Sequence, residues 1–295
     1  MSFYENLYRK ELIPGVKKPG TAEKEFYFEY IRDFARLDKR VQEMLIDRAY
    51  EIYSTSFKGL DKNSFADSEF YDPIAVCIKL LLLKTRNDNI IQGFATVALY
   101  EFYALPNNFS LSNKYLISNG IVCLSTSYKG KGALKDINIT CAHLLVDEYN
   151  QGNFIHIDVS SNPITYYAMC KIGKFIVPMY QRVYSEDIEK FMIRFIRKLG
   201  YERVEGKNNL VVRDTYGALG IDKRLFLDNL DKLPEEMKYF IGLTGLEDNV
   251  GLCFLSAYRA IQGNSLGIPQ TDYKSFPDLD AVAYQWVLDS NRPRL

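Results

Sequence analysis

The chain has 295 residues, of which 47% are hydrophobic and 14% aromatic, so it can bury a substantial core. Its 37 Lys and Arg residues balance 37 Asp and Glu residues. This balance leaves no overall field that would favour nucleic acid, an anionic membrane or an acidic partner. We therefore expect a globular protein of one elaborated domain or two, with no nucleic-acid and no membrane partner.

The cysteine pattern and the N-terminal segment indicate a reducing compartment. The five cysteines are scattered, odd in number and mostly embedded in apolar runs, as is typical of reduced core thiols. The first twenty residues lack the apolar region of a secretory signal. The longest apolar stretch, 74–83, is interrupted by Lys79 and is far shorter than the ~20 residues of a membrane span. We expect a cytoplasmic protein.

Residues 1–60 are expected to form an arm followed by helices that pack on the core. Prolines and glycines interrupt residues 1–20 repeatedly, which indicates an irregular segment. From Phe26 to Tyr53, apolar residues recur mostly at intervals of three and four, which predicts one or two amphipathic helices up to about Ser56.

The middle of the chain, residues 61–182, predicts an α/β core. Two apolar runs joined by a polar turn indicate a hairpin, and a third strand is interrupted at Asn119-Gly120. A buried helix, a further strand and a short helix opened by Asn162-Pro163 follow. The predicted strands are 74–83, 93–102, 115–126 and 154–159, and the predicted helices are 134–149 and 163–170. This order indicates a layered α/β (α+β) domain with at least one crossover connection.

Residues 183–295 are expected to form a C-terminal α/β extension. The pattern predicts a helix over 186–199, a hairpin over 202–214, and a strand or helix in the core over 252–261. A faint similarity between segments 195–201 and 167–175 leaves two interpretations open. The extension is either a degenerate second copy of the core or a lobe on the acceptor side of a cleft.

The segment Ser127-Tyr-Lys-Gly-Lys-Gly-Ala-Leu134 lies between the third predicted strand and the buried helix. Gly130 and Gly132 allow successive backbone N–H groups to form a concave turn, and the helix N-terminus adds partial positive charge. Lys129 and Lys131 would add cationic contacts to a phosphate group. A Gly-Lys-Gly turn between a strand and a helix is also a common plain connection, so both interpretations stay open.

This segment resembles the acetyl-CoA motif of GNAT N-acetyltransferases, Gln/Arg-x-x-Gly-x-Gly/Ala. Lys129 stands at the first position and Gly132 at the central glycine, whereas Leu134 replaces a small residue that would lie near the pyrophosphate. The resemblance covers residues 70–182. It implies a central mixed sheet flanked by helices, with an N-terminal helical and a C-terminal mixed extension, and acetyl-CoA or another acyl-CoA as co-substrate. The residues it places around that co-substrate are Val122, Cys123, Leu124, Lys129, Gly130, Lys131, Gly132, Ala133, Leu134 and Asn162.

The reaction that the resemblance implies is direct attack of an amine on the thioester, with a base that accepts the amine proton. Strand periodicity places His156 and Asp158 on one face of strand 154–159, and they are the first candidates for the base and its partner. The alternative is a buried pair with a structural role. Glu101 is the second candidate for the base.

The family's tyrosine that protonates the departing thiolate would fall at Met169 or Cys170, and neither residue matches. Tyr166 and Tyr167, nearly one turn earlier, are the candidates to replace it, although both also suit a core position. His143 and His156 are the only histidines, and they show no metal-ligand spacing, so no metal is expected.

The sequence therefore predicts an acyl-CoA-dependent N-acyltransferase, in the simplest case an acetyltransferase, acting on an unknown amine of a small molecule or a protein. A non-catalytic CoA-binding or interaction protein of the same fold is the alternative. A third interpretation, an enzyme that uses another activated donor such as an aminoacyl-tRNA, is disfavoured by the neutral charge.

Overall fold

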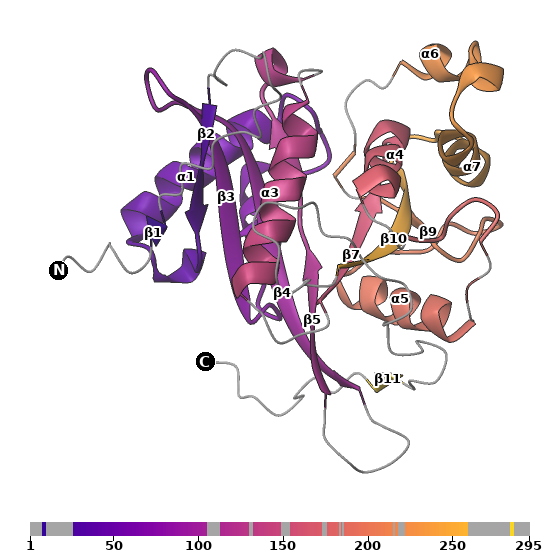
Figure 1. The fold of residues 1–295 in the computed structure, drawn as a ribbon, viewed down its shortest axis with the longest axis horizontal. Coiled ribbons are helices and arrows are strands. Elements are labelled where there is room, and N and C mark those ends of the chain that lie inside the picture. Colours follow the sequence, from indigo (N-terminus) through magenta and orange to yellow (C-terminus); the bar gives the residue numbers. More distant parts are fainter. Residues whose placement is uncertain are drawn as a thin grey trace.

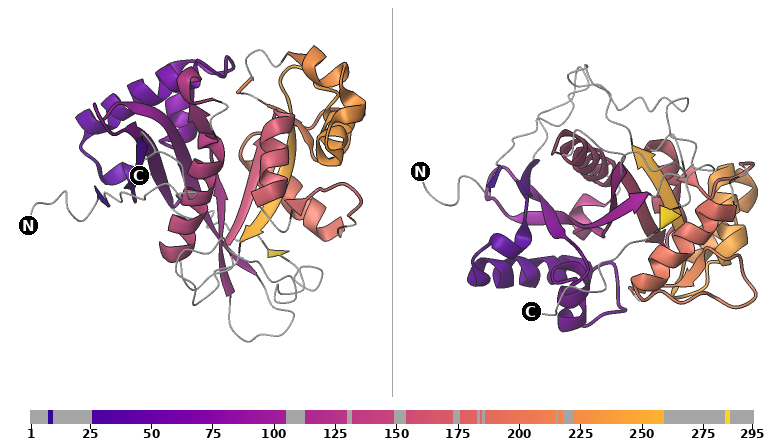
Figure 2. Two further views of the ribbon diagram at one scale, coloured as in Figure 1. Left: turned by 45° about the horizontal axis from the view of Figure 1, so that its top comes forward. Right: turned by 90° about the horizontal axis from the view of Figure 1, so that it is seen from below.

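The computed structural model describes residues 8–9, 26–104, 113–129, 132–148, 154–172, 176–182, 184, 186–214, 216–217, 222–258 and 284–285. A single sheet separates two layers of helices (Figures 1 and 2). The strands are β1 (Tyr8–Arg9), β2 (Phe26–Ile31), β3 (Cys77–Thr85), β4 (Ile91–Ala104), β5 (Asn113–Asn119), β6 (Val122–Leu124), β7 (Phe154–Ser160), β8 (Ile176–Val177), β9 (Val211–Arg213), β10 (Val250–Tyr258) and β11 (Tyr284–Gln285). The α-helices are α1 (Lys39–Tyr53), α2 (Lys62–Glu69), α3 (Ala133–Glu148), α4 (Pro163–Ile172), α5 (Glu186–Lys198), α6 (Lys223–Leu227) and α7 (Glu235–Thr244), and the 3-10 helices are η1 (Phe34–Arg36), η2 (Thr126–Tyr128) and η3 (Leu230–Lys232).

Among the described residues the sheet has 11 strands and the order β1-β2-β3-β4-β5-β7-β10-β8, with β6 and β11 paired to β4 and β9 paired to β10. All strand pairs are antiparallel except β5 with β7, which are parallel and are connected through β6 and α3. The expected mixed sheet flanked by helices is therefore confirmed. Because β10 lies between β7 and β8, the boundary expected at residue 183 falls within one continuous sheet.

The segment at the start of the predicted N-terminal helices is a strand, so the helix prediction is wrong there. All six residues of β2 are buried, and β2 pairs with β3 along its whole length. Phe26, Phe28 and Tyr30 contact one hydrophobic core while Ile31 contacts the other. This alternation has the period of two that is typical of a strand. The sequence does not reveal it, because aromatic residues lie on both faces of the strand.

The other predicted elements of the core are confirmed with small shifts of their ends. The predicted hairpin is β3 and β4, and the interrupted third strand is β5 and β6. The predicted helices over 134–149, 163–170 and 186–199 are α3, α4 and α5. The undecided core element near residue 252 is the strand β10.

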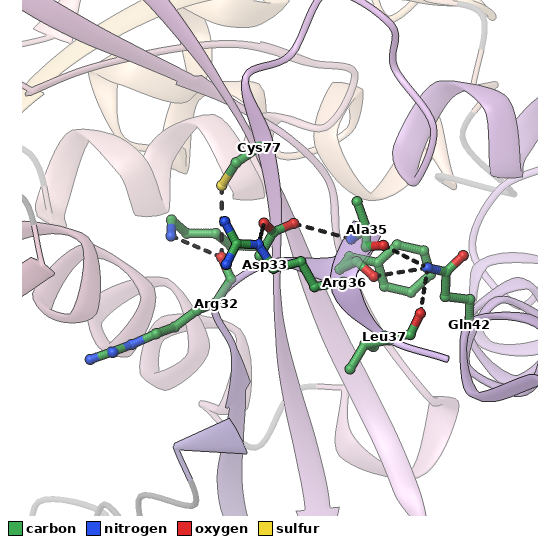
Figure 3. Close-up of polar contacts among 9 residues, drawn as sticks. Arg32, Asp33, Ala35, Arg36, Leu37, Gln42 and Cys77 are labelled. Atoms are coloured by element: carbon green, nitrogen blue, oxygen red, sulfur yellow. Dashed lines mark hydrogen bonds and ion pairs between the residues drawn. The ribbon is translucent and has the colours of Figure 1, made fainter. Parts of the chain in front are cut away.

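Two side chains, one from α1 and one from β3, donate hydrogen bonds to the main chain around η1, as Figure 3 shows. The Nε2 atom of Gln42 donates to the carbonyl oxygens of Phe34, Ala35 and Leu37 at 3.0–3.2 Å. The carbonyl of Arg32 accepts from Lys79 Nζ at 3.0 Å. Folding removes these carbonyl groups from water. The buried Gln42 side chain supplies the hydrogen bonds that they would otherwise lack.

Two hydrophobic clusters pack on the sheet, and the larger one also includes residues of α4, α7 and β10. One contains α3 together with Leu81, Leu83, Ala95, Val97 and Leu99, and the other contains α1, α2 and α5. The five cysteine thiols are free. In the described part of the chain, no helix is both long and apolar enough to span a bilayer, and no group of three or more His, Cys, Asp or Glu side chains is placed to hold a metal ion.

Candidate active site

Within the described segments, the two parallel strands of the sheet pair over three residues and then separate. Leu116, Ile117 and Ser118 of β5 pair with the first residues of β7, and pairing ends at Ser118 opposite His156. After Gly120 the chain continues as β6, which pairs with β4 and not with β7. The two halves of the sheet diverge from this point (Figure 2, left).

Gly120 is required for the chain to change course between β5 and β6. A Cβ atom at this position would lie 2.0 Å from the carbonyl oxygen of Thr96 on β4. The neighbouring Ile121 carbonyl accepts from the Thr96 N–H at 3.0 Å. At the predicted interruption, Asn119-Gly120, the main chain passes close to Thr96 of β4. This close contact keeps β6 paired with β4.

The edge of β6 that faces β7 is formed by the N–H and C=O groups of Val122 and Leu124, and we call it the β6 edge. Ile121 and Ser125 bond to β4, at Thr96 and Gln92. Because hydrogen-bonding directions alternate along a strand, Val122 and Leu124 direct their main-chain groups away from β4. Cys123 has the opposite orientation, and burial raises the pKa of its thiol well above its ordinary value.

A central cavity of about 520 Å³ lies where the strands separate. Residues from both helical layers line it, so it passes between β6 and β7. The lining from the α3 and α4 side includes Leu134, Asn138, Cys141, Leu145, Asn162, Thr165 and Met169, and that from the other side includes Ser56, Phe57, Tyr201, Asp214 and Tyr216. A cavity of this size, mainly apolar with a few polar groups, is typical of a small-molecule site.

The N-terminus of α3 lies at one end of the cavity, next to Lys129 and Leu134, which both line it. Lys129 Nζ donates to the Thr55 carbonyl at 3.1 Å. Gly132 has a φ of +79°, which favours glycine, and Ala133 is buried at the start of the helix. Gly130 and Lys131 lie outside the described residues. Leu134 packs against the hydrophobic cluster that contains α3 and also borders the cavity. Its side chain is larger than the Gly or Ala that the motif has at this position.

His156 and Asp158 lie together on one face of β7 and both line the cavity. The His156 Nε2 and Asp158 Oδ2 atoms are 3.6 Å apart. The other imidazole nitrogen, Nδ1, is 3.0 Å from the Ser118 Oγ atom. Asp158 Oδ1 accepts from the Val159 N–H at 2.7 Å, which fixes the carboxylate beside the ring.

A second polar group borders the cavity and is formed by residues far apart in the sequence. The Glu69 carboxylate accepts from the Thr96 and Tyr216 hydroxyls, and Thr96 Oγ1 accepts from the Ile121 N–H at 3.1 Å. Burial raises the pKa of the Glu69 carboxyl, and these hydrogen bonds partly offset that effect. Burial also raises the pKa of Asp214, whose carboxylate accepts from the Tyr216 N–H.

Two cavity-lining phenols belong to the same region. Burial, followed by the nearby Asp214, raises the pKa of Tyr201 well above its ordinary value. Burial and the adjacent Glu69 do the same for Tyr216. Both hydroxyls therefore stay protonated at neutral pH and can donate a hydrogen bond.

The structure places the remaining predicted site residues differently. Asn162 lines the cavity and also caps α4, since its Oδ1 accepts from the Ile164 N–H at 2.8 Å, so Nδ2 is the group it can offer to a ligand. Tyr166 is fully buried, and its hydroxyl donates to the Pro178 carbonyl at 2.6 Å. Tyr167 lies against the Lys171 ammonium. Among the described residues, Tyr166, Tyr167 and Glu101 do not line the cavity, whereas Met169 does.

Sequence reasoning missed Ser118, Glu69, Asp214, Tyr201 and Tyr216. Ser118 directly precedes the interruption at Asn119-Gly120, and this position was a usable signal. Tyr201, Asp214 and Tyr216 come from segments after α5 and line the cavity, whereas Glu69 comes from α2 and lies behind the lining, hydrogen-bonded to Tyr216. No local spacing in the sequence relates them.

No protein-family model and no curated protein matches the sequence. Several solved structures with low identity to this chain are named as acetyltransferases. A GCN5-related N-acetyltransferase from Kribbella flavida is 11% identical over 50% of this chain, with a TM-score of 0.33, and the match spans only 33% of that protein. A GNAT-family acetyltransferase from Bacillus anthracis is 11% identical over 53% of this chain and 85% of its own length, with a TM-score of 0.32.

A third similar structure is the AtaT toxin, solved with part of its antitoxin and acetyl-CoA. It is 10% identical over 63% of this chain and 90% of its own length, with a TM-score of 0.26. The assignment of a function rests on the residues around the cavity.

Proposed function

We propose that this protein is an acyl-CoA-dependent N-acyltransferase that transfers an acyl group, in the simplest case acetyl, to an amine. The observation that carries the proposal is the β6 edge beside the central cavity, which pairs with no other described strand. The pantetheine arm of CoA contains two amide groups, which such an edge can bind as a strand would. The N-terminus of α3 with Lys129 and Gly132 lies at one end of this edge and suits the pyrophosphate.

The opposite end of the edge supports the chemistry. We assign His156 as the base that accepts the proton of the amine and Asp158 as its partner, because both line the cavity where pairing of β5 and β7 ends. We assign Tyr201 as the group that stabilises the departing thiolate by donating a hydrogen bond, because its protonated hydroxyl belongs to a residue that lines the cavity. It replaces Tyr166 in that role, because the Tyr166 hydroxyl is bonded to a main-chain carbonyl.

The acceptor side of the cavity is lined by Asp158, Asp214 and two tyrosines, and so it suits a compact amine. We propose that the amine belongs to a small molecule or a protein and that no nucleic acid or membrane takes part. The cytoplasmic location stays part of the proposal and is consistent with the free thiols.

One observation favours a second candidate function, a CoA-binding protein without transferase activity. Met169 lines the cavity at a position where the resemblance implies a tyrosine, and Leu134 borders it where a small residue is usual. Both departures can coexist with binding of CoA.

A thermal-shift titration with acetyl-CoA and with CoA tests the proposal. Saturating ligand should raise the stability by ~2 to 4 kcal/mol. Release of CoA in the presence of a primary-amine panel then separates the enzyme from the non-catalytic alternative. Absence of any shift would refute both functions.

A further inference from the structure

Ser118 and His156 face each other at the point where the parallel strands stop pairing. Their Oγ and Nδ1 atoms are 3.0 Å apart, within hydrogen-bonding distance. Only 1% of Ser118 is exposed, yet it lines the central cavity together with His156. A ligand that enters between β6 and β7 therefore meets the serine hydroxyl at the end of its path.

The surroundings of His156 hold the ring in one orientation. Its Nε2 atom lies 3.6 Å from Asp158 Oδ2, and its ring packs edge-on against Phe254 with 5.8 Å between the centroids. Asp158 cannot turn away easily, since its Oδ1 accepts from the Val159 N–H at 2.7 Å and from Asn119 Nδ2 at 3.4 Å. The carboxylate therefore stays beside Nε2.

This arrangement selects the tautomer of the neutral imidazole. A proton on Nε2 faces the carboxylate favourably, whereas a lone pair there would face another acceptor. With the proton on Nε2, Nδ1 is the acceptor, and its partner is the Ser118 hydroxyl. If His156 acts as a base, the nitrogen that takes up the proton is consequently the one covered by Ser118.

We infer that Ser118 is a catalytic residue that relays the proton from the attacking amine to His156. The inference rests on the proposed function. As the amine nitrogen forms its bond to the thioester carbon, its proton passes to Ser118 Oγ, and the serine proton passes to His156 Nδ1. The C–S bond breaks with its electron pair on sulfur, and the imidazolium is stabilised by Asp158. The proton then returns through Ser118 to solvent or to the thiolate, so Ser118 is regenerated and never acylated.

The test uses the full chain with acetyl-CoA and a panel of hydroxylamine, ethylamine, ethanolamine and a lysine-containing tripeptide. Ser118→Ala should lower kcat by about 100-fold with little change in the KM for acetyl-CoA. Ser118→Thr, which keeps the hydroxyl, should restore most of kcat. Because the two residues act as one unit, the double variant Ser118→Ala, His156→Ala should be no slower than His156→Ala alone.

Ser256→Ala is the matched control. Ser256 pairs with His156 from the other neighbouring strand, is fully buried, and its hydroxyl has no hydrogen-bond partner in the described structure. Its removal should leave kcat unchanged. If Ser256→Ala lowered kcat as much as Ser118→Ala does, the loss of activity would be caused by altered packing, and the relay would be overturned.

Three further outcomes would overturn the relay while leaving acyl-CoA binding intact. These are full activity of Ser118→Ala, additive losses in the double variant, and an acyl adduct on Ser118 in the intact mass of the wild-type protein. Binding of acetyl-CoA without release of CoA to any amine would refute the relay and favour the non-catalytic alternative. Failure to bind acetyl-CoA in the thermal-shift titration would instead refute the proposed function itself.

Discussion

The Thr96 hydroxyl accepts the N–H of Ile121, with 3.1 Å between Oγ1 and N. The same hydroxyl donates to the buried carboxylate of Glu69 at the end of α2. The irregular segment between β5 and β6 is thereby attached to the helical layer of α1 and α2. The position of the β6 edge depends on this attachment, because Ile121 directly precedes Val122.

Thr96→Val should lower the free energy of unfolding by about 1 to 3 kcal/mol, because the part-buried N–H of Ile121 and the buried Glu69 carboxylate both lose the Thr96 hydroxyl. The variant should also bind acetyl-CoA more weakly, since the β6 edge loses its support. Urea denaturation and a thermal-shift titration measure the two effects. Thr96→Ser, which keeps the hydroxyl, is the control, and equal losses in both variants would contradict the role of this hydrogen bond.

The raised pKa of Glu69 predicts a specific dependence of stability on pH. Folding makes this carboxyl bind its proton more tightly than in the unfolded chain, mainly because of burial. Its contribution to stability is therefore fully present below about pH 4.3 and is lost as the pH rises through the raised pKa. Glu69→Gln, which resembles the protonated acid, lacks this loss.

The stability of Glu69→Gln relative to wild type should consequently increase between about pH 5 and about pH 8. Urea denaturation measures the difference in the free energy of unfolding between the variant and wild type at each pH. Any effect of altered hydrogen bonding that does not depend on pH cancels when the two differences are compared. Asp61→Asn is a control, because Asp61 is an exposed carboxylate at the start of the same helix and folding lowers its pKa. A difference for Glu69→Gln that stays constant with pH would contradict the prediction.

The fold around the site could be predicted from the sequence because apolar residues there recur with the clear spacing of a strand or a helix. The interrupted strand at Asn119-Gly120, the helix after Gly132 and the strand with His156 and Asp158 are all present. Strand β2 was mistaken for a helix because aromatic residues on both of its faces removed the alternation. A strand that is buried on both faces has apolar residues at successive positions. Because this burial arises only when the sheet has formed, a short segment shows no pattern that identifies it.

The candidate site could be predicted only in the part that is continuous in sequence. Lys129, Leu134, His156 and Asp158 line one cavity, as their order along a strand-helix-strand unit implies. Glu69 and Tyr216 are 147 residues apart and are joined by a hydrogen bond that no spacing reveals. Tyr166 lies close in sequence to the position of the missing tyrosine, but its side chain points from α4 into the core and not into the cavity.

The β6 edge makes a direct prediction for ligand binding. Val122→Pro removes an N–H that faces the cavity but no hydrogen bond to β4, so the strand should persist. Acetyl-CoA affinity should fall by about tenfold, the equivalent of one hydrogen bond. Val122→Ala keeps the N–H and is the control. Equal affinity of the Pro and Ala variants, measured by thermal-shift titration, would show that this N–H does not bind the ligand.

The close approach of Gly120 to β4 predicts a cost that is unusual for the addition of one methyl group. A Cβ atom would lie 2.0 Å from the Thr96 carbonyl oxygen and 2.7 Å from its carbon, and main-chain atoms on a central strand cannot yield without breaking pairing. Gly120→Ala should therefore destabilise the protein by about 2 to 4 kcal/mol and weaken acetyl-CoA binding.

Gly242→Ala is the matched control for this substitution. Gly242 lies within α7, and a Cβ atom there would meet no atom within 4 Å. Alanine is a better helix former than glycine, so this variant should gain up to about 1 kcal/mol. Urea denaturation of both variants gives the comparison. If Gly120→Ala were as stable as wild type, the chain between β5 and β6 could move away from β4, and the strand separation that forms the cavity would not depend on this contact.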